Sequence, residues 1–461
     1  MRSFRLAGAP YVSPRETSSV NGPGRGRRAF WLQTLRTVLL VLFLLSIYVE
    51  VPLNVGFLIP SFFTLLILIP LLALMYHRRV YWYELYFVVQ VVLILLLTAF
   101  LSPGFEWLGE KLLGLVQTTS SIIGGILLLK LIGGLRQRWL THALFALWVV
   151  LLVGATLEVV GVLTPVSDAF REAAYSEGNY GVYESDDRDV NLIGHVRPSL
   201  FTTEPSLLAI GFFVFINSWL VAAYSQRNLL VACIAALVML GVSGSPILVL
   251  SLAVSLIIML FSERNVSTLW FTIGLAFIGI AVAIYVRPDI ASDLTARFSD
   301  AYQNIGTASA SSENRRLVYP FVTLVDVLKN SPFFGVGISG KELVGDYSSL
   351  PIAAEYALGN NVLAWFFVYL GVVGSVLFGM AVRYYWRRMG INQPMLLVFL
   401  ILALSQTMGG FETPRFWGYT FLFIGVVWKR SKMRDSAPTR FGKIEPGYAG
   451  DLPKHIGKSS Q

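Results

Sequence analysis

The sequence predicts an all-α polytopic membrane protein with about 12 transmembrane helices and one long outer loop before the tenth. Of the 461 residues, 55% are hydrophobic and only 14% are charged, and the mean hydropathy is +0.65. A soluble globule of this length cannot bury that much apolar surface. The apolar residues also recur in runs long enough to cross a hydrocarbon core of ~30 Å as helices.

The apolar runs follow one another along the chain. We expect helices at 30–49, 58–76, 83–101, 112–131, 140–163, 206–224, 229–242, 247–261, 266–286, 362–384, 394–408 and 417–428. The first run is longer than a signal-peptide core and no small-residue cleavage site follows it, so it is expected to be retained. Residues 1–29 and 431–461 are rich in Gly, Pro, Ser and basic residues. They are expected to be disordered tails of a membrane domain at 30–430.

The positions of Lys and Arg predict the orientation of these spans. If the basic N-terminus is cytoplasmic, every inner connector is basic, as the positive-inside rule requires. The inner basic residues are Arg78, Arg79, Arg136, Arg138, Arg227, Arg264, Arg387, Arg388, Lys429, Arg430 and Lys432. The outer connectors are mixed or acidic, and two of them, 164–205 and 287–360, are long. We therefore expect a multi-pass protein of the inner (cytoplasmic) membrane with both termini in the cytoplasm.

Charge and cysteine content exclude several classes of partner. The net charge of +9 lies mostly in the tails and inner connectors, so it indicates topology and not a nucleic-acid partner. Cys233 is the only cysteine, which excludes an intramolecular disulfide and a cysteine metal cluster. No metal and no cofactor are expected.

The outer loop at 287–360 is unusual because basic residues normally avoid short translocated loops. It contains Arg297, Arg315, Arg316, Lys329 and Lys341. An anionic ligand at the outer leaflet would explain them.

Within this loop, Ser312 is expected to cap an amphipathic helix from Glu313 to Leu328, with the two adjacent arginines in its first turn. The glycines that follow, Gly335, Gly337 and Gly340, spell G-x-G-x-x-G. No strand precedes them, so tight turns are a better interpretation than a dinucleotide site.

The segment before the sixth span contains the first candidate chemistry. Glu204 stands beside Pro205 at the mouth of an apolar helix, where it is a candidate general base, and His195 is a weaker one. Arg197 is suited to a phosphate. The alternative is that the segment caps the helix and Arg197 pairs with an acid, and spacing alone favours that alternative.

Two further segments are candidate binding elements. Asn360 and Asn361 either bind sugar hydroxyls or cap the tenth span, in which Gly371 and Gly374 are expected to allow close packing. The turns at 241–246 and 411–415 join short spans, so they are candidate walls of a recessed cavity.

Outer-face arginines form a third candidate set. Arg197, Arg315, Arg316 and Arg415 have guanidinium groups that can hold a diphosphate in a bidentate manner. The alternative is pairing with Asp300, Glu313 or Glu412. Glu158, near the outer end of the fifth span, either faces the cavity or snorkels to the interface.

Three motifs together resemble one family. Arg197-x6-Glu204-Pro-Ser before a middle span, Pro332-Phe-Phe-Gly-Val-Gly337, and Asn360-Asn361-x9-Gly371-x2-Gly374 are similar in order and sidedness to the O-antigen polymerase and O-antigen ligase superfamily, the Wzy- and WaaL-like proteins. The resemblance covers roughly 30–430. It implies a GT-C-like membrane fold and a metal-independent glycosyltransferase that uses polyprenyl-diphosphate-linked glycans at the outer face of the membrane.

The resemblance favours one branch of that family. The ligase branch has a histidine where this chain has Asn360, which favours a polysaccharide (O-antigen or exopolysaccharide) polymerase that transfers a growing glycan from undecaprenyl diphosphate to the next lipid-linked repeat unit. The alternatives are ligase-type transfer to lipid A or a protein, and, in another class, a lipid-linked glycan flippase. The expected partners are an undecaprenyl-diphosphate-linked oligosaccharide, membrane lipid, a chain-length regulator and a flippase.

Overall fold

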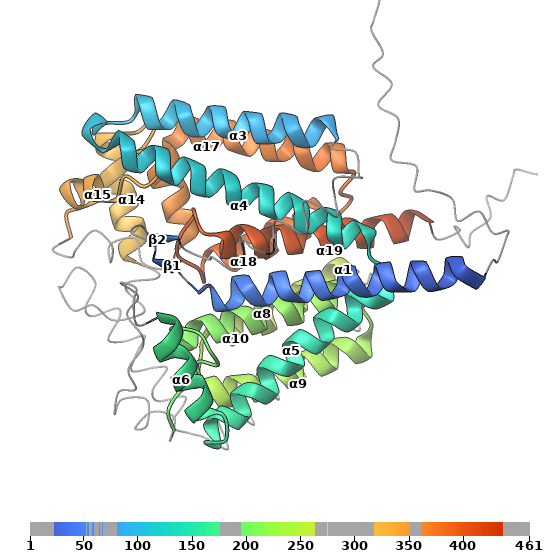
Figure 1. The fold of residues 1–461 in the computed structure, drawn as a ribbon. Helices are drawn as coiled ribbons and strands as arrows, with labels where there is room; N and C mark the ends of the chain where they lie inside the picture. Colours follow the sequence, from blue (N-terminus) through green and yellow to red (C-terminus); the bar gives the residue numbers. More distant parts are fainter. Residues whose placement is uncertain are drawn as a thin grey trace, which may run out of the picture.

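The computed structural model describes residues 23–51, 53–54, 58–59, 64, 67, 81–175, 195–262, 274, 318–350 and 361–436. In these ranges the chain is helical apart from one two-stranded hairpin, and the long helices lie side by side (Figure 1). Seven of the described helices are long and apolar enough to cross a membrane. The prediction of a multi-pass helical membrane protein is therefore confirmed.

Those seven elements contain most of the apolar core. They are α1 (Pro23–Val49), α3 (Trp82–Leu101), η1 (Phe105–Trp107) continuing into α4 (Leu108–Gly134), α5 (Gln137–Val159), α8 (Pro205–Ala222), α9 (Gln226–Ser243) and α17 (Val362–Met389). Two shorter apolar helices are α10 (Ile247–Ser262) and α18 (Pro394–Ser405). α18 packs against α10 and against α19 (Pro414–Ser436), which is apolar first and basic at its end. The short elements are β1 (Leu53–Asn54), β2 (Leu58–Ile59), α6 (Thr164–Tyr175), α14 (Tyr319–Asn330) and α15 (Lys341–Tyr347).

The expected spans can be compared with these helices one by one. All except 58–76 and 266–286 coincide with a helix, and those two lie almost entirely outside the described residues. The expected start at residue 58 is wrong, because Leu58–Ile59 pairs antiparallel with Leu53–Asn54. The physical reason is local: Asn54 and Gly56 favour a turn, so the chain reverses before any helix begins.

Spans beside the two candidate turns also differ in length from expectation, and α19, expected at 417–428, has 23 residues. α9 has 18 residues, about 27 Å of helix, so it crosses most of the core and the turn after it is not deeply recessed. α18 has only 12 residues, or about 18 Å, so the turn that follows it remains at membrane depth if its other end is at the surface.

The helix ends alternate between two ends of the bundle as the sequence predicts. At one end, the start of α19 contacts the end of α1, and the start of α17 contacts the end of α18. At the other end, Trp428 donates to Met389 O and Gln137 donates to Ala222 O. We call the first of these the site end; α6, α14, α15 and the hairpin lie there, at the left of Figure 1.

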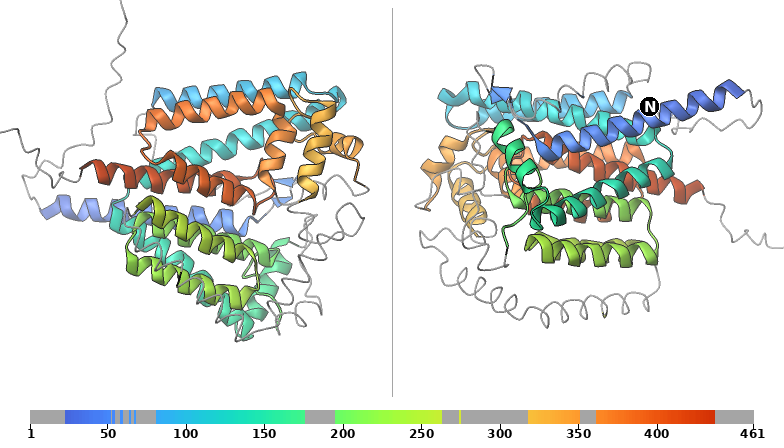
Figure 2. Two further views of the ribbon diagram at one scale, coloured as in Figure 1. Left: turned by 180° about the vertical axis from the view of Figure 1, so that it is seen from behind. Right: turned by 60° about the horizontal axis from the view of Figure 1, so that its bottom comes forward.

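α8 lies at the centre of the bundle. It packs against α5, α9, α10 and α19, and 94% of it is buried inside the protein (Figure 2). A helix that is apolar on every side is typical of such a position, because it has no face that needs water. Its N-terminus at Pro205 therefore opens onto the site end from the middle of the bundle.

The helix expected to begin after Ser312 begins later. α14 starts at Tyr319 with Val318 as its N-cap residue, so the expected range from Glu313 to Leu328 is wrong at its start. Pro320 suits this boundary, since proline is tolerated in the first turn of a helix, where its missing N–H would have no helical partner. Arg315 and Arg316 are therefore not in the first turn of α14, and they lie outside the described residues.

α14 is tied to the chain after α15 by Asp326. Its carboxylate accepts hydrogen bonds from Ser349 N at 3.0 Å and Ser349 Oγ at 2.6 Å. These bonds, chiefly the one from the hydroxyl, lower the pKa of Asp326 below its ordinary value because they favour the ionised form.

This lowered pKa predicts a pH effect on the α14–α15 unit. A carboxyl whose pKa is depressed in the folded state adds stability above its unfolded pKa of about 4, and that stability is lost as the pH falls through the folded value. In hydrogen exchange corrected for intrinsic rates, wild-type α15 is expected to lose protection below about pH 4. Asp326→Asn is expected to show lower protection already at pH 7 and little further change; a pH response equal to that of the wild type would contradict this.

Candidate functional site

The segment from Arg197 to Ser206 forms a rigid turn above the N-terminus of α8. Its centre is strained, because Leu200 has φ 39° and Phe201 has φ 66°, and non-glycine residues rarely adopt positive φ. Two tyrosine hydroxyls contact it: Tyr48 donates to Leu200 O at 3.0 Å, and Tyr175 shares its proton between Phe201 O at 2.9 Å and Val49 O at 2.6 Å. Consecutive strained residues fixed in this way suggest that the chain direction here matters for function.

His195 and Arg197 both contact the C-terminus of α9. His195 Nε2 lies 2.8 Å from Val242 O, and Arg197 Nε donates to Ser243 O at 3.0 Å. Helix C-terminal carbonyls lack partners and attract positive groups, so these contacts cap α9. A carbonyl only accepts, so Nε2 of the histidine is the donor and Nδ1 is its basic nitrogen. Through this bond Arg197 caps a helix, so it has a structural contact in addition to its candidate role in phosphate binding.

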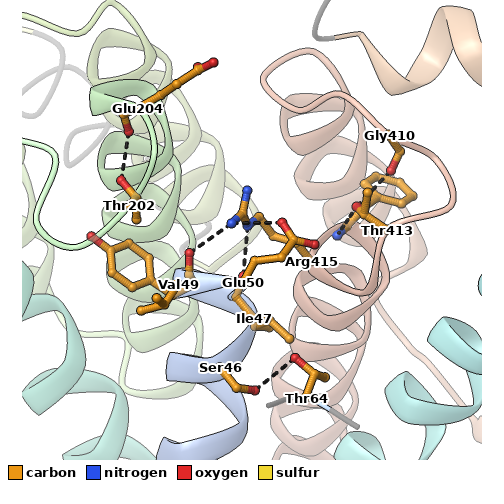
Figure 3. Close-up of polar contacts among 12 residues, drawn as sticks. Ser46, Ile47, Val49, Glu50, Thr64, Thr202, Glu204, Gly410, Thr413 and Arg415 are labelled. Atoms are coloured by element: carbon orange, nitrogen blue, oxygen red, sulfur yellow. Dashed lines mark hydrogen bonds and ion pairs between the residues drawn. The ribbon is translucent and has the colours of Figure 1, made fainter. Parts of the chain in front are cut away.

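Glu204 is the N-cap residue of α8, followed by Pro205 in the first turn, as the capping alternative predicted. Its Oε2 accepts from Ser206 Oγ at 2.8 Å, and its side chain is exposed. Figure 3 shows the carboxylate directed away from Thr202 and from Arg415. A carboxylate at a helix N-terminus is stabilised by the helix dipole. Glu204 is therefore both a cap residue and accessible to a ligand.

Arg415 is bound inside the protein. One guanidinium nitrogen lies 2.9 Å from Glu50 Oε2, and the group donates to Ile47 O at 2.8 Å and Tyr48 O at 3.1 Å (Figure 3). Both side chains of the pair are about 10% exposed. The guanidinium thus caps the end of α1 and pairs with a buried acid, and this acid is none of the three that the pairing alternative named.

The segment from Pro332 to Gly340, which we call the glycine loop, docks into a break in α17 through its motif Pro332 to Gly337. At Gly371 the helix leaves helical geometry, with φ 62° and ψ −170°. The loop exchanges four backbone hydrogen bonds with the broken turn: Val336 N to Val368 O, Gly337 N to Tyr369 O, Val372 N to Pro332 O, and Val373 N to Phe333 O. The loop thereby satisfies the backbone groups that the break leaves without helical partners.

The glycines in this unit are there for close approach and positive φ. A Cβ on Gly335 would lie 2.1 Å from Val368 O, and one on Gly371 would lie 2.4 Å from Gly335 N. Tight turns in the glycine motif are thus confirmed, since Gly335 and Gly337 have positive φ. Close helix packing is confirmed for Gly374, which faces Thr98 of α3. For Gly371 the expectation needs correction: the neighbour is a loop, and the helix is broken.

A buried polar cluster lies under the same loop. Ser339, itself at φ 58°, donates its hydroxyl to Glu412 Oε1 at 2.8 Å, and Tyr369 faces the same carboxylate. Lys111 is fully buried under Gly337 and donates to Ser102 Oγ at 2.8 Å and Pro103 O at 2.5 Å. The loop thus rests on one ammonium and one carboxylate.

Asn361 is the N-cap residue of α17. Its Oδ1 accepts from Ala364 N at 3.0 Å, and its Nδ2 donates to Gln406 Oε1 at 3.0 Å. The side chain is fully buried, so the capping alternative describes its position. Asn360, Arg297, Arg315 and Arg316 lie outside the described residues.

Sequence reasoning gave too little weight to four charged residues of the site end. Glu158 accepts a hydrogen bond from the strained turn, and Glu50 pairs with Arg415. Lys111 lies under the glycine loop, and Glu412 accepts a hydrogen bond from Ser339. Their common signal is an ionisable residue in or beside an apolar run, where charge is costly unless it is paired. Among the residues that the structure describes, no three His, Cys, Asp or Glu side chains are placed to hold a metal ion.

Comparison with known proteins adds no relative to this description. No family model matches the chain, and no curated protein matches it significantly.

Proposed function

We propose that the chain is a polysaccharide polymerase that transfers a growing glycan from undecaprenyl diphosphate to the next lipid-linked repeat unit. The proposal includes a GT-C-like fold with twelve spans and a reaction at the outer face of the cytoplasmic membrane. Such a transfer needs a held diphosphate leaving group, a positioned acceptor hydroxyl and a base.

One observation carries the proposal: the three segments with family-like motifs meet at one end of the bundle. The Arg197–Ser206 turn contacts Tyr48, whose backbone carbonyl accepts from Arg415. Glu412 lies three residues before Arg415 and accepts a hydrogen bond from Ser339 of the glycine loop. That loop is docked on α17. The first segment is thus linked, through Glu412 and Arg415, to the other two, which follow it by more than 100 residues.

The distribution of charge supports the proposed orientation. The end opposite the site end contains the basic residues Arg136, Arg138, Arg227, Arg387, Arg388, Lys429, Arg430 and Lys432. Under the positive-inside rule that end is cytoplasmic, which places the site end at the outer face. Lipid-linked glycans would then reach the site from the outer leaflet.

The proposal predicts a large effect at Glu204. Glu204→Gln keeps the size of the side chain and a hydrogen-bond acceptor for Ser206 but removes the base. Long-chain polymer is expected to fall at least about 100-fold, the usual contribution of general acid–base catalysis, while single repeat units accumulate on the carrier. The measurement is the glycan ladder of cells that express each variant in place of the wild type.

Glu172→Gln is the matched control, because Glu172 is another exposed acid at the site end, on α6. It should leave the ladder unchanged at equal expression. An unchanged ladder in Glu204→Gln would contradict the role of Glu204. Deletion of the gene distinguishes the alternative functions: full-length polymer left on the carrier would indicate a ligase, and repeat units trapped at the inner leaflet would indicate a flippase.

A further inference from the structure

We propose that Glu158 is a positioning residue that holds the strained Arg197–Ser206 turn and thereby places Glu204 and Arg197. We call the contacts of Glu158 with Ser199 and Leu200 the clamp. The catalytic part of this proposal rests on the proposed function, whereas the clamp itself does not.

Glu158 lies near the end of α5 and is 8% exposed. Its Oε2 accepts from Leu200 N at 2.7 Å, and Ser199 Oγ lies 3.5 Å from its Oε1. The carboxylate therefore binds the first of the two residues with positive φ, through the backbone group whose direction that φ determines. A substrate is not needed to explain any of these contacts.

The other bonds described for Leu200 and Phe201 come from neutral side chains. Tyr48 and Tyr175 donate to the carbonyls of Leu200 and Phe201, and Ser167 Oγ accepts from Phe201 N at 3.2 Å. A hydrogen bond to a carboxylate is roughly twice as strong as a neutral one. Glu158 is thus the charged group that holds Leu200 directly, and its burial is tolerable because the turn supplies its donors.

The two strained residues, Leu200 and Phe201, lie in sequence between the two candidate ligand-binding residues. Arg197 precedes Leu200 by three residues, and Glu204 follows it by four. If Leu200 and Phe201 relaxed to negative φ, the chain would leave the turn in a different direction and both side chains would move. A displacement of about 1 Å costs on the order of 100-fold in rate when groups must be aligned for reaction.

Hydrogen–deuterium exchange of the protein in nanodiscs tests the clamp without any substrate. Glu158→Leu is expected to raise exchange at the amides of 199–204 at least about tenfold, whereas Glu158→Gln keeps a weaker, neutral acceptor for Leu200 N and should raise exchange much less. Exchange that stays at the wild-type level in Glu158→Leu would overturn the proposal.

The glycan ladder then tests the consequence for function. Glu158→Leu is expected to lower polymer about 100-fold at equal expression, and Glu158→Gln is expected to retain it. Loss of polymer in Glu158→Gln with unchanged exchange would mean that the charge itself is needed, which overturns a positioning role. Raised exchange with normal polymer would overturn it too.

A rescue experiment separates positioning from a general loss of folding. Glycine adopts positive φ without strain, so Phe201→Gly in the Glu158→Leu background should restore part of the polymer and of the protection. Phe201→Ala removes the same contact of the ring with Phe170 but keeps the Cβ, so it should not rescue. Equal behaviour of the two double variants would overturn the clamp.

The proposed function can fail separately from the clamp. If cells that lack the gene still make the same polymer, the function is wrong, and the exchange data alone decide whether Glu158 holds the turn.

Discussion

Replacing Gly371 with alanine is expected to separate the glycine loop from α17 and to destabilise the protein by at least about 3 kcal/mol. The backbone at Gly371, φ 62° and ψ −170°, belongs to a region that is essentially restricted to glycine. A Cβ there would also lie 2.5 Å from Phe333 O, a backbone atom that cannot rotate away. The four hydrogen bonds between the loop and the broken turn depend on this geometry.

The measurement for Gly371→Ala is thermal unfolding in nanodiscs together with polymer formation. Tm should fall and polymer should be lost, because the position of the loop also allows Ser339 to donate a hydrogen bond to Glu412. Gly379→Ala is the matched control in the same helix, where an added Cβ meets no atom within 4 Å. Alanine in a helix is favoured over glycine by about 1 kcal/mol, so this control should unfold at the same temperature or higher. Equal Tm values for the two variants would show that the break is not needed.

The membrane spans and their alternation could be predicted because the signals are local. An apolar run of sufficient length and a basic connector can each be read without knowing what they contact. The helix break at Gly371 could not be predicted in this way. Its cause is the loop at 332–337, which arrives from another part of the sequence and provides the missing backbone partners. A glycine in an apolar helix is equally compatible with close helix packing, which is what Gly374 does.

The candidate site was predictable in position but not in detail. Glu204 before Pro205 indicated a helix start, and the structure has α8 begin there. The positive φ of Leu200 and Phe201 has no sequence signature, since neither residue type favours it. The role of Glu158 depends on that turn, so it could not be derived before the turn was seen. The partner of Arg415 could not be derived, because Glu50 is near it in space and distant in sequence.

Replacing Arg415 with alanine is expected to destabilise the protein by about 3–5 kcal/mol, because it removes one partner of a buried ion pair with Glu50. It also removes the donors to Ile47 O and Tyr48 O at the end of α1. Lys329→Ala is the control at the same end of the bundle. Lys329 is 70% exposed and pairs with Asp326 at 3.4 Å, and such exposed pairs contribute about 0–1 kcal/mol. Thermal unfolding of both variants gives the comparison.

A double substitution distinguishes this structural role of Arg415 from binding of the diphosphate. Glu50→Gln with Arg415→Met removes both charges while keeping similar volumes, and such replacement of a buried pair is often close to neutral. Tm should therefore recover a large part of the loss seen in Arg415→Ala. If Arg415 acts only through the fold, polymer returns with stability. A double variant that folds but makes no polymer would instead assign the guanidinium to the ligand, since its structural partner is no longer present.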